Sequence, residues 1–396
     1  MQLVDLIRAL EDRKSACAAQ QARAAAALVA IRVAERAAAG VAAPRRERGV
    51  AAEIALARRE SPKRGDTHLG FAKAMLEMPH TFALLRSGVL SEWRAMGLVR
   101  DTACLTREDR RTVDRELCAD PAVVDGLSTG QLVARTRELA ARLDGEAMVR
   151  QAVKAAGDRR VSSRPAPDTM AYVTALLPVR EAVTVEATLR RDAASICAAG
   201  DMRTRSQIMA DLLVQRVTGV STAAAVPVTI NLVVSDDVLF GDGTEGAHVD
   251  GYGTVPAGLV RKWVHESERT LLRRVYASPK TGVLVAMESK ARCFPAGLAR
   301  VIDVRDRVCR TPWCDAPIKH HDHIVDHHKG GATTANNGAG LCEACNYAKQ
   351  APGWSVEPDP PKPDVLHSYT LRTPSGHTHR STAPPLPTPL DIHPAA

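Results

Sequence analysis

The sequence is poor in aromatic residues, which make up only 3% of its 396 residues. Ala, Val and Leu must therefore fill most of the core, although a chain of this length is enough for two or three domains. Long apolar runs are also missing: the longest one near the N-terminus, 24–31, lies between two arginines and is far too short to cross a bilayer. We expect no membrane partner and no secretion signal, and hence a cytoplasmic protein.

Phosphate-binding fingerprints are missing as well. The segment 227–234 alternates apolar and polar residues and predicts a strand, but the glycines at 241–254 do not follow it directly in a phosphate-binding pattern. We interpret these glycines as turns and expect no small-molecule cofactor. Positive charge is in modest excess, with a net charge of +8, which favours nucleic acid as a partner.

The N-terminal part, up to about residue 160, is rich in Ala and Arg and has helical periodicity. Ser128 and Gln131 have the spacing of a capping box, and the apolar residues that follow them share one helical face. A Pro- and Ser-containing break at 161–170 precedes further helix, and a hairpin is expected near 271–289. The first part of the chain is therefore predicted to be mostly helical.

Nine cysteines are present, and five of them are scattered through apolar or helical contexts where they are interpreted as small buried side chains. The other four form two close pairs, C-x4-C at Cys309 and Cys314 and C-x-x-C at Cys342 and Cys345. In a reducing compartment such pairs favour metal over disulfides, and four thiolates suit a tetrahedral structural Zn²⁺. The alternative is four unrelated free cysteines.

Five histidines lie within residues 320–328, between the two cysteine pairs. The stretch IKHHDHIV predicts a short strand, on which Asp322 and His323 point to opposite sides and are able to flank one phosphate group. The double glycine at 330–331 demands a tight turn, and CEACNYAK opens a helix that carries Asn346. Two strands and a helix, pinned by zinc, are therefore expected here.

These motifs resemble a known family. C-x4-C, D-H-I, G-G-x-T, an Asn and C-x-x-C-N-x-x-K resemble the HNH endonuclease motif of the ββα-metal nucleases. DMRTRSQIMAD at 201–211, PDTM at 167–170 and FPAGLARVIDVRDRVCR before the first cysteine pair are similar to the actinobacterial 13E12-repeat proteins. In those proteins a helical domain of unknown function, number 222, precedes a C-terminal HNH module. The similarity covers roughly residues 65–357.

The resemblance implies roles for four residues. His323 would be the general base that takes a proton from the attacking water, and the ordinary pKa of histidine near 6.5 suits that task. Asn337 would brace the metal-binding loop and orient the base. Asp322 and Asn346 would hold Mg²⁺ or another divalent ion, since carboxylate and amide oxygens suit such an ion. His321, His327 and His328 stay open as further contributors.

DNA is the expected partner. The resemblance places Lys349 near the DNA backbone, and three arginines around the module are candidates for phosphate contacts: Arg305, Arg307 and Arg310. The alternative for the arginines is ion pairing with Asp303 and Asp306.

The predicted fold class is α+β with three parts. Residues 1–290 are expected to form a mostly α-helical domain with a small strand and hairpin part, and 291–357 the zinc-stabilised ββα-metal (HNH) module. Residues 358–396 are expected to be a short extended segment and a disordered Pro-rich tail. The predicted function is metal-dependent DNA hydrolysis. The alternatives are a zinc-stabilised DNA-binding module without nuclease activity, and a helical partner-binding domain with the nuclease as effector.

Overall fold

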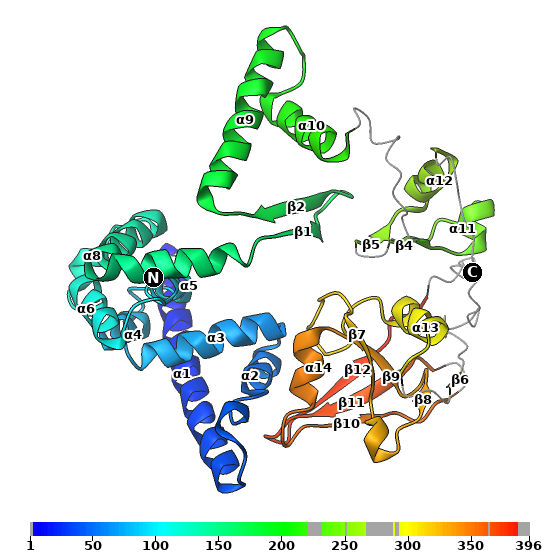
Figure 1. Ribbon diagram of the computed structural model, residues 1–396, viewed down its shortest axis with the longest axis horizontal. Coiled ribbons are helices and arrows are strands. Elements are labelled where there is room, and N and C mark those ends of the chain that lie inside the picture. Colours follow the sequence, from blue (N-terminus) through cyan, green and yellow to red (C-terminus); the bar gives the residue numbers. More distant parts are fainter. Residues whose placement is uncertain are drawn as a thin grey trace. The chain divides into compact units, whose positions relative to one another are not determined.

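The computed structural model describes residues 3–219, 232–249, 252–266, 288–289, 293–362 and 365–386 (Figure 1). As far as it is described, the chain forms two compact units. The first consists of Met1–Gln151, Met287–Pro360 and His367–Ala383, and the second of Ala152–Ala286, Pro361–Leu366 and Pro384–Ala396. The boundaries expected at residues 290 and 357 stay a prediction. The first unit joins the N-terminal helices to the segment that carries the paired cysteines.

The N-terminal helices pack around small side chains. Their bounds are α1 Leu3–Ala38, α2 Val50–Arg58, α3 Pro62–Met75, α4 Pro79–Ser87, α5 Glu92–Asp101, α6 Arg107–Cys118, α7 Pro121–Val124 and α8 Thr129–Ala156. Helix α1 packs on α3 and α4 and buries Ala18, Ala19 and Ala22, which let helices approach closely. Ser128 and Gln131 exchange the two hydrogen bonds of a capping box at the start of α8, so the capping-box prediction is confirmed.

The C-terminal segment of the first unit contains short strands and two helices. Its elements are β6 Glu288–Ser289, α13 Ala296–Asp306, β7 His320–His323, β8 Thr333–Thr334, β9 Gly338–Leu341, α14 Glu343–Lys349, β10 Ser355–Pro358, β11 Ser368–Arg372 and β12 Thr378–Thr382. Strands β7 and β9 pair antiparallel, with Asp322 opposite Ala339, and α14 contacts β7 (Figure 1). Strands β10, β11 and β12 form an antiparallel sheet. Two of these strands lie where the sequence predicted only a short extended segment.

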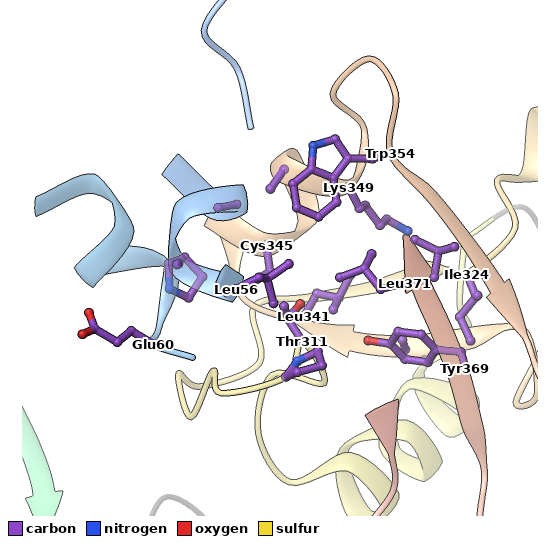
Figure 2. Close-up of a pocket in the computed structure, with 17 residues that line it drawn as sticks. Leu56, Glu60, Thr311, Ile324, Leu341, Cys345, Lys349, Trp354, Tyr369 and Leu371 are labelled. Carbon is purple, nitrogen blue, oxygen red and sulfur yellow. The ribbon is translucent and has the colours of Figure 1, made fainter. Parts of the chain in front are cut away.

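The N-terminal helices pack directly on this segment. Leu56 of α2 shares a buried cluster with Trp354 and Leu371, and Figure 2 shows these side chains around one apolar cavity. Glu53, buried in α2, pairs with Arg32 and also accepts a hydrogen bond from the main-chain nitrogen of Ser375, in the turn between β11 and β12. Apolar contact and a buried ion pair together join the two parts of the unit.

The second unit begins with a hairpin, at the place where the sequence predicted only a break. Its elements are β1 Arg160–Pro165, β2 Ala171–Leu176, α9 Val179–Ala198, α10 Arg205–Thr218, β3 Leu232–Val233, α11 Asp236–Phe240, β4 Ala247–Val249, β5 Gly253–Val255 and α12 Ala257–Glu266. Only the end of the strand predicted at 227–234 is described, as β3. The hairpin predicted near 271–289 lies outside the described residues, except for β6. Among the described helices, none combines the length and apolarity needed to cross a membrane.

Candidate functional site

The four paired cysteines meet at one point. All four are buried, and their sulfur atoms lie within 4.8 Å of one another, with 3.8 Å between Cys314 Sγ and Cys342 Sγ. A tetrahedron of thiolates with Zn–S bonds near 2.3 Å has an edge of about 3.8 Å, whereas a disulfide would bring the sulfur atoms to about 2.05 Å. The cluster therefore fits a zinc ion and not a pair of disulfides.

Local structure explains how the cysteines reach this arrangement. Cys309 follows α13, and its main-chain nitrogen donates to Ala316 O, which closes the loop that carries Cys314. Cys342 is the N-cap of α14, and its sulfur accepts from the main-chain nitrogen of Cys345 at 3.5 Å. The sulfur atom of Cys309, followed by those of Cys314 and Cys342, raises the pKa of the Cys345 thiol. Four thiolates therefore need a cation between them.

A second group of polar side chains lies between β7 and α14. The Lys349 ammonium is 2.7 Å from Asp322 Oδ2, and it also donates to the main-chain oxygen of His323. Among the described residues, Asp322 Oδ2 nevertheless accepts no well-directed hydrogen bond, and the buried Oδ1 of Asn346, one turn before Lys349, has no hydrogen-bond partner. Buried oxygens without donors are costly unless a ligand satisfies them. Carboxylate and amide oxygens are ligand types that a divalent cation accepts, and within the described residues the Lys349 side chain supplies positive charge at Asp322.

His323 points away from Asp322, as expected for neighbours on a strand. Its Nε2 is 2.9 Å from Thr333 Oγ1, and its ring lies 4.7 Å from that of Phe294 and 5.5 Å from that of His327. Burial lowers the pKa of His323 below 6.5, although the Asp322 carboxylate acts in the opposite direction. The imidazole is therefore held neutral at pH 7, which is the state that accepts a proton.

Asn337 holds the loop between β7 and β8. Its Oδ1 accepts from Val325 N at 2.8 Å, and its Nδ2 donates to Val325 O at 3.0 Å and to Ala332 O at 2.9 Å. Both positions of the double glycine require a residue without a side chain. A Cβ on Gly331 would lie 1.8 Å from Val325 O, and Gly330 has a φ of +89°. The amide thus closes the loop that follows His323.

Arg305 and Arg310 point into the protein. The Asp306 carboxylate, with no exposed side-chain surface, pairs with Arg305 at 2.6 Å and with Arg310 at 2.7 Å, and accepts from Gly340 N. Arg305 also donates to Ala335 O and Gly338 O. Burial opposes ionisation of Asp306, but the two arginines outweigh it and hold the pKa of this carboxyl below its usual value. Both guanidinium groups are therefore buried in ion pairs with Asp306 and do not face a DNA duplex. Ion pairing is the alternative that was considered for these arginines.

The other predicted residues lie at the edges of this region. Arg307, partly buried, ends α13 with a φ of +63°, and burial lowers its pKa. His321 Nε2 is 2.6 Å from Asp303 Oδ1, so this histidine is engaged within the protein. His327 and His328 are exposed in the turn before the glycines. The structure therefore places the His327 ring beside that of His323, whereas His321 is paired with Asp303 and His328 is exposed.

Some contacts of the site were not predicted. The hydrogen bond between Thr333 and His323 joins β8 to β7, although each of these strands is paired with another strand, β6 and β9 respectively. Phe294 contacts the same imidazole from just before α13, which no local pattern indicates. His367, whose Nδ1 is 3.1 Å from Arg310 and whose Nε2 is 2.9 Å from Asn336 O, comes from the segment expected to be extended.

The segment from β7 to α14 has the architecture of an HNH-type domain. It consists of two antiparallel strands and a helix, with four cysteines clustered at the start of the helix and His323 next to Asp322 on the first strand. The model of the HNH endonuclease family matches residues 308–351, and that of the family described as a domain of unknown function, DUF222, matches residues 10–306. The chain belongs to the DUF222 family and carries an HNH endonuclease domain, so the family predicted from the motifs is confirmed. Comparison with curated proteins and with solved structures gives no match.

Proposed function

We propose that the protein is a metal-dependent endonuclease that hydrolyses phosphodiester bonds of DNA. The observation that carries the proposal is a pair of buried, unsatisfied oxygens, on Asp322 and Asn346, beside a histidine that burial keeps neutral. A fold without a ligand at this point would gain nothing from leaving these oxygens without donors. The HNH family match supports the same conclusion.

In the proposed mechanism, the hydrogen bond between Thr333 Oγ1 and Nε2 orients the His323 ring, and the tautomer that acts carries its proton on Nε2. The opposite nitrogen, Nδ1, has no hydrogen-bond partner among the described residues, so it is available to take the proton of the attacking water. The water oxygen then bonds to phosphorus, the bond to the 3′ oxygen breaks, and the 3′ oxygen takes a proton from solvent, leaving 5′-phosphate and 3′-hydroxyl ends. Asn337 keeps the following loop closed and so orients the imidazole.

Asp322 and Asn346 would hold Mg²⁺ or another divalent ion through oxygen atoms. Such an ion, when bound, supplies positive charge for the phosphate oxygens and the leaving oxygen. Lys349 balances the Asp322 charge in the described structure and is proposed to contact the DNA backbone, as is Arg307. Zn²⁺ at the four cysteines is assigned a structural role, since all four tetrahedral positions are protein sulfur.

The test is incubation of the purified full chain with supercoiled plasmid, with and without added Mg²⁺. We expect nicked and linear DNA only with the ion, and ligatable 5′-phosphate ends. Asp322→Asn should abolish cleavage while zinc content stays unchanged. Asp315→Asn is the matched control, because Asp315 is an exposed carboxylate of the same domain. Plasmid that is bound but not cut under any divalent ion would contradict the proposal and favour a DNA-binding module.

A further inference from the structure

A cation and two aromatic rings meet beside the candidate site. The Arg48 guanidinium lies 5.7 Å from the centre of the Tyr347 ring, and the His320 ring lies 6.1 Å from the same ring. Tyr347 is 46% exposed, and Arg48 and His320 are partly exposed. The three side chains come from the turn before α2, from α14 and from β7. We call this group the Arg48 platform.

The turn that carries Arg48 is fixed on the nuclease domain. Buried Arg36 donates to the main-chain oxygens of Arg46 and Arg48, each at 2.7 Å, and to Pro352 O at 3.2 Å. Gly49 has a φ of +82°, and a Cβ there would lie 2.8 Å from Ala351 and from Trp354 Nε1. The main chain at Arg48 is therefore held in one place against the domain, so a ligand that contacts Arg48 needs to order its side chain but not its main chain.

The Arg48 platform lies next to Asp322 and Asn346 along β7 and α14. Tyr347 directly follows Asn346 on α14, and His320 precedes Asp322 by two residues on β7. Residues two apart on a strand face the same side and are separated by about 6.6 Å. Nucleotides of one DNA strand rise about 3.4 Å each along the helix axis. His320, one member of the platform, therefore lies one or two nucleotide steps along β7 from Asp322.

The charge of the platform is available to a ligand. Within the described residues, the Arg48 guanidinium has no hydrogen bond or ion pair. Its acidic neighbour Glu47 is neutralised by Lys73 at 2.5 Å. An arginine that shares a site with exposed aromatic rings suits a strand of nucleic acid, since the guanidinium pairs with phosphate and the ring packs on sugar or base.

We propose that the Arg48 platform binds the DNA strand next to the scissile phosphate, so that the DUF222 part of the chain supplies a substrate contact to the HNH domain. The inference rests on the proposed function, because it identifies where the substrate of that site continues. It gives the N-terminal helices a direct role in binding, through the turn that Arg36 holds in place.

The experiment measures affinity for a short fluorescent duplex by anisotropy, without added divalent ion, over a series of salt concentrations. Arg48→Ala should weaken binding roughly fivefold and lower the salt slope by about 0.9, the value for one lost phosphate contact. Arg23→Ala is the matched control, since Arg23 is exposed on α1 and has no hydrogen bond or ion pair among the described residues. Tyr347→Phe should bind like wild type and Tyr347→Ala more weakly. Zinc content and melting temperature check the fold of each variant.

The outcomes separate this inference from the proposed function. Wild-type cleavage together with equal affinity and salt slope for Arg48→Ala and Arg23→Ala would overturn the platform and leave the nuclease standing. Binding that depends on Arg48, in a protein that never cleaves, would support the platform and contradict the nuclease. A wild-type chain that does not bind DNA would overturn both.

Discussion

Two carboxylates of the first unit, Asp306 at the end of α13 and Asp322 on β7, have opposite surroundings. Asp306 meets two guanidinium groups and a main-chain donor, and its side chain is completely enclosed. Asp322 meets one ammonium, and its Oδ2 accepts no well-directed hydrogen bond. The first carboxylate is fully satisfied by the protein itself, whereas the second is satisfied only in part.

In the proposed function, the difference distinguishes a group that stabilises the fold from one that serves a ligand. Every partner of Asp306 lies in α13, in β9 or just after α13, so the network joins the helix to the strand pair. The network also joins the two family matches, because the DUF222 match ends at residue 306 and the HNH match begins at residue 308. Asp322 and Asn346 instead combine burial with unused oxygen lone pairs, the combination that a cation would complete.

The largest effect on stability is expected when the cluster of four cysteines loses one of its zinc ligands. Cys342→Ser removes one of the four sulfur ligands but keeps a residue that can cap α14, so the HNH domain should lose its zinc and unfold. The free energy at stake is on the order of 10 kcal/mol, typical of structural zinc. Metal analysis by mass spectrometry and thermal melting test this prediction. Cys293→Ser, at an exposed cysteine, should change neither. A well-folded chain without zinc would contradict the assignment.

Removal of the enclosed carboxylate should be the next largest effect. Asp306→Ala leaves Arg305 and Arg310 buried without a counter-charge, which should lower the free energy of unfolding by about 3–5 kcal/mol. Asp322→Asn should cost far less, since its oxygen is incompletely satisfied in the folded chain. Denaturant titration of both variants sharpens the comparison directly. Equal losses would mean that the two carboxylates play the same structural role.

His367 makes the Asp306 network sensitive to acid. Burial, and then the charge of Arg305, lowers the pKa of His367 to about 4. Because the unfolded chain binds a proton on this residue near pH 6.5 and the folded chain does not, stability should fall between pH 6.5 and 4 by up to about 3 kcal/mol. The stability of His367→Gln should depend less on pH in that window than that of His328→Gln, the exposed control. Identical pH profiles of stability for the two variants would show that His367 does not cause the loss of stability in acid.

Local sequence predicted the elements around the metal-capable residues, because each is determined by neighbours in the chain. The capping box at Ser128, the turn at Gly330 and the helix that opens at Cys342 are all of this kind. The match to the HNH endonuclease family could be predicted from the spacing of the cysteines and the D-H-I motif. Such motifs report chemistry and chain order, and they require no knowledge of tertiary contacts.

Tertiary contacts account for what was not predicted. Arg305 and Arg310 have the spacing and charge of DNA contacts, and only the packing of α13 on β9 shows that they face Asp306. The strands β11 and β12 lie in a Pro-rich region, but their pairing with β10 buries Tyr369 and Leu371. The packing of α2 on the HNH domain joins residues more than 300 positions apart, as in the hydrogen bond between Glu53 and Ser375. No local pattern contains that information.

The central claim, that His323 is the base of a metal-dependent nuclease, is tested most directly by a plasmid-nicking time course. His323→Ala should reduce the rate about 100-fold or more, equivalent to about 2.7 kcal/mol, while zinc content and DNA affinity stay at wild-type values. The wild-type rate should stay level from pH 8 down to about 6.5 and fall only below it, because burial lowers the pKa of the imidazole that must be neutral. His328→Ala, at an exposed histidine in the turn that follows β7, is the control and should cut as wild type does. If His323→Ala cuts as fast as His328→Ala, the assignment of the base is wrong.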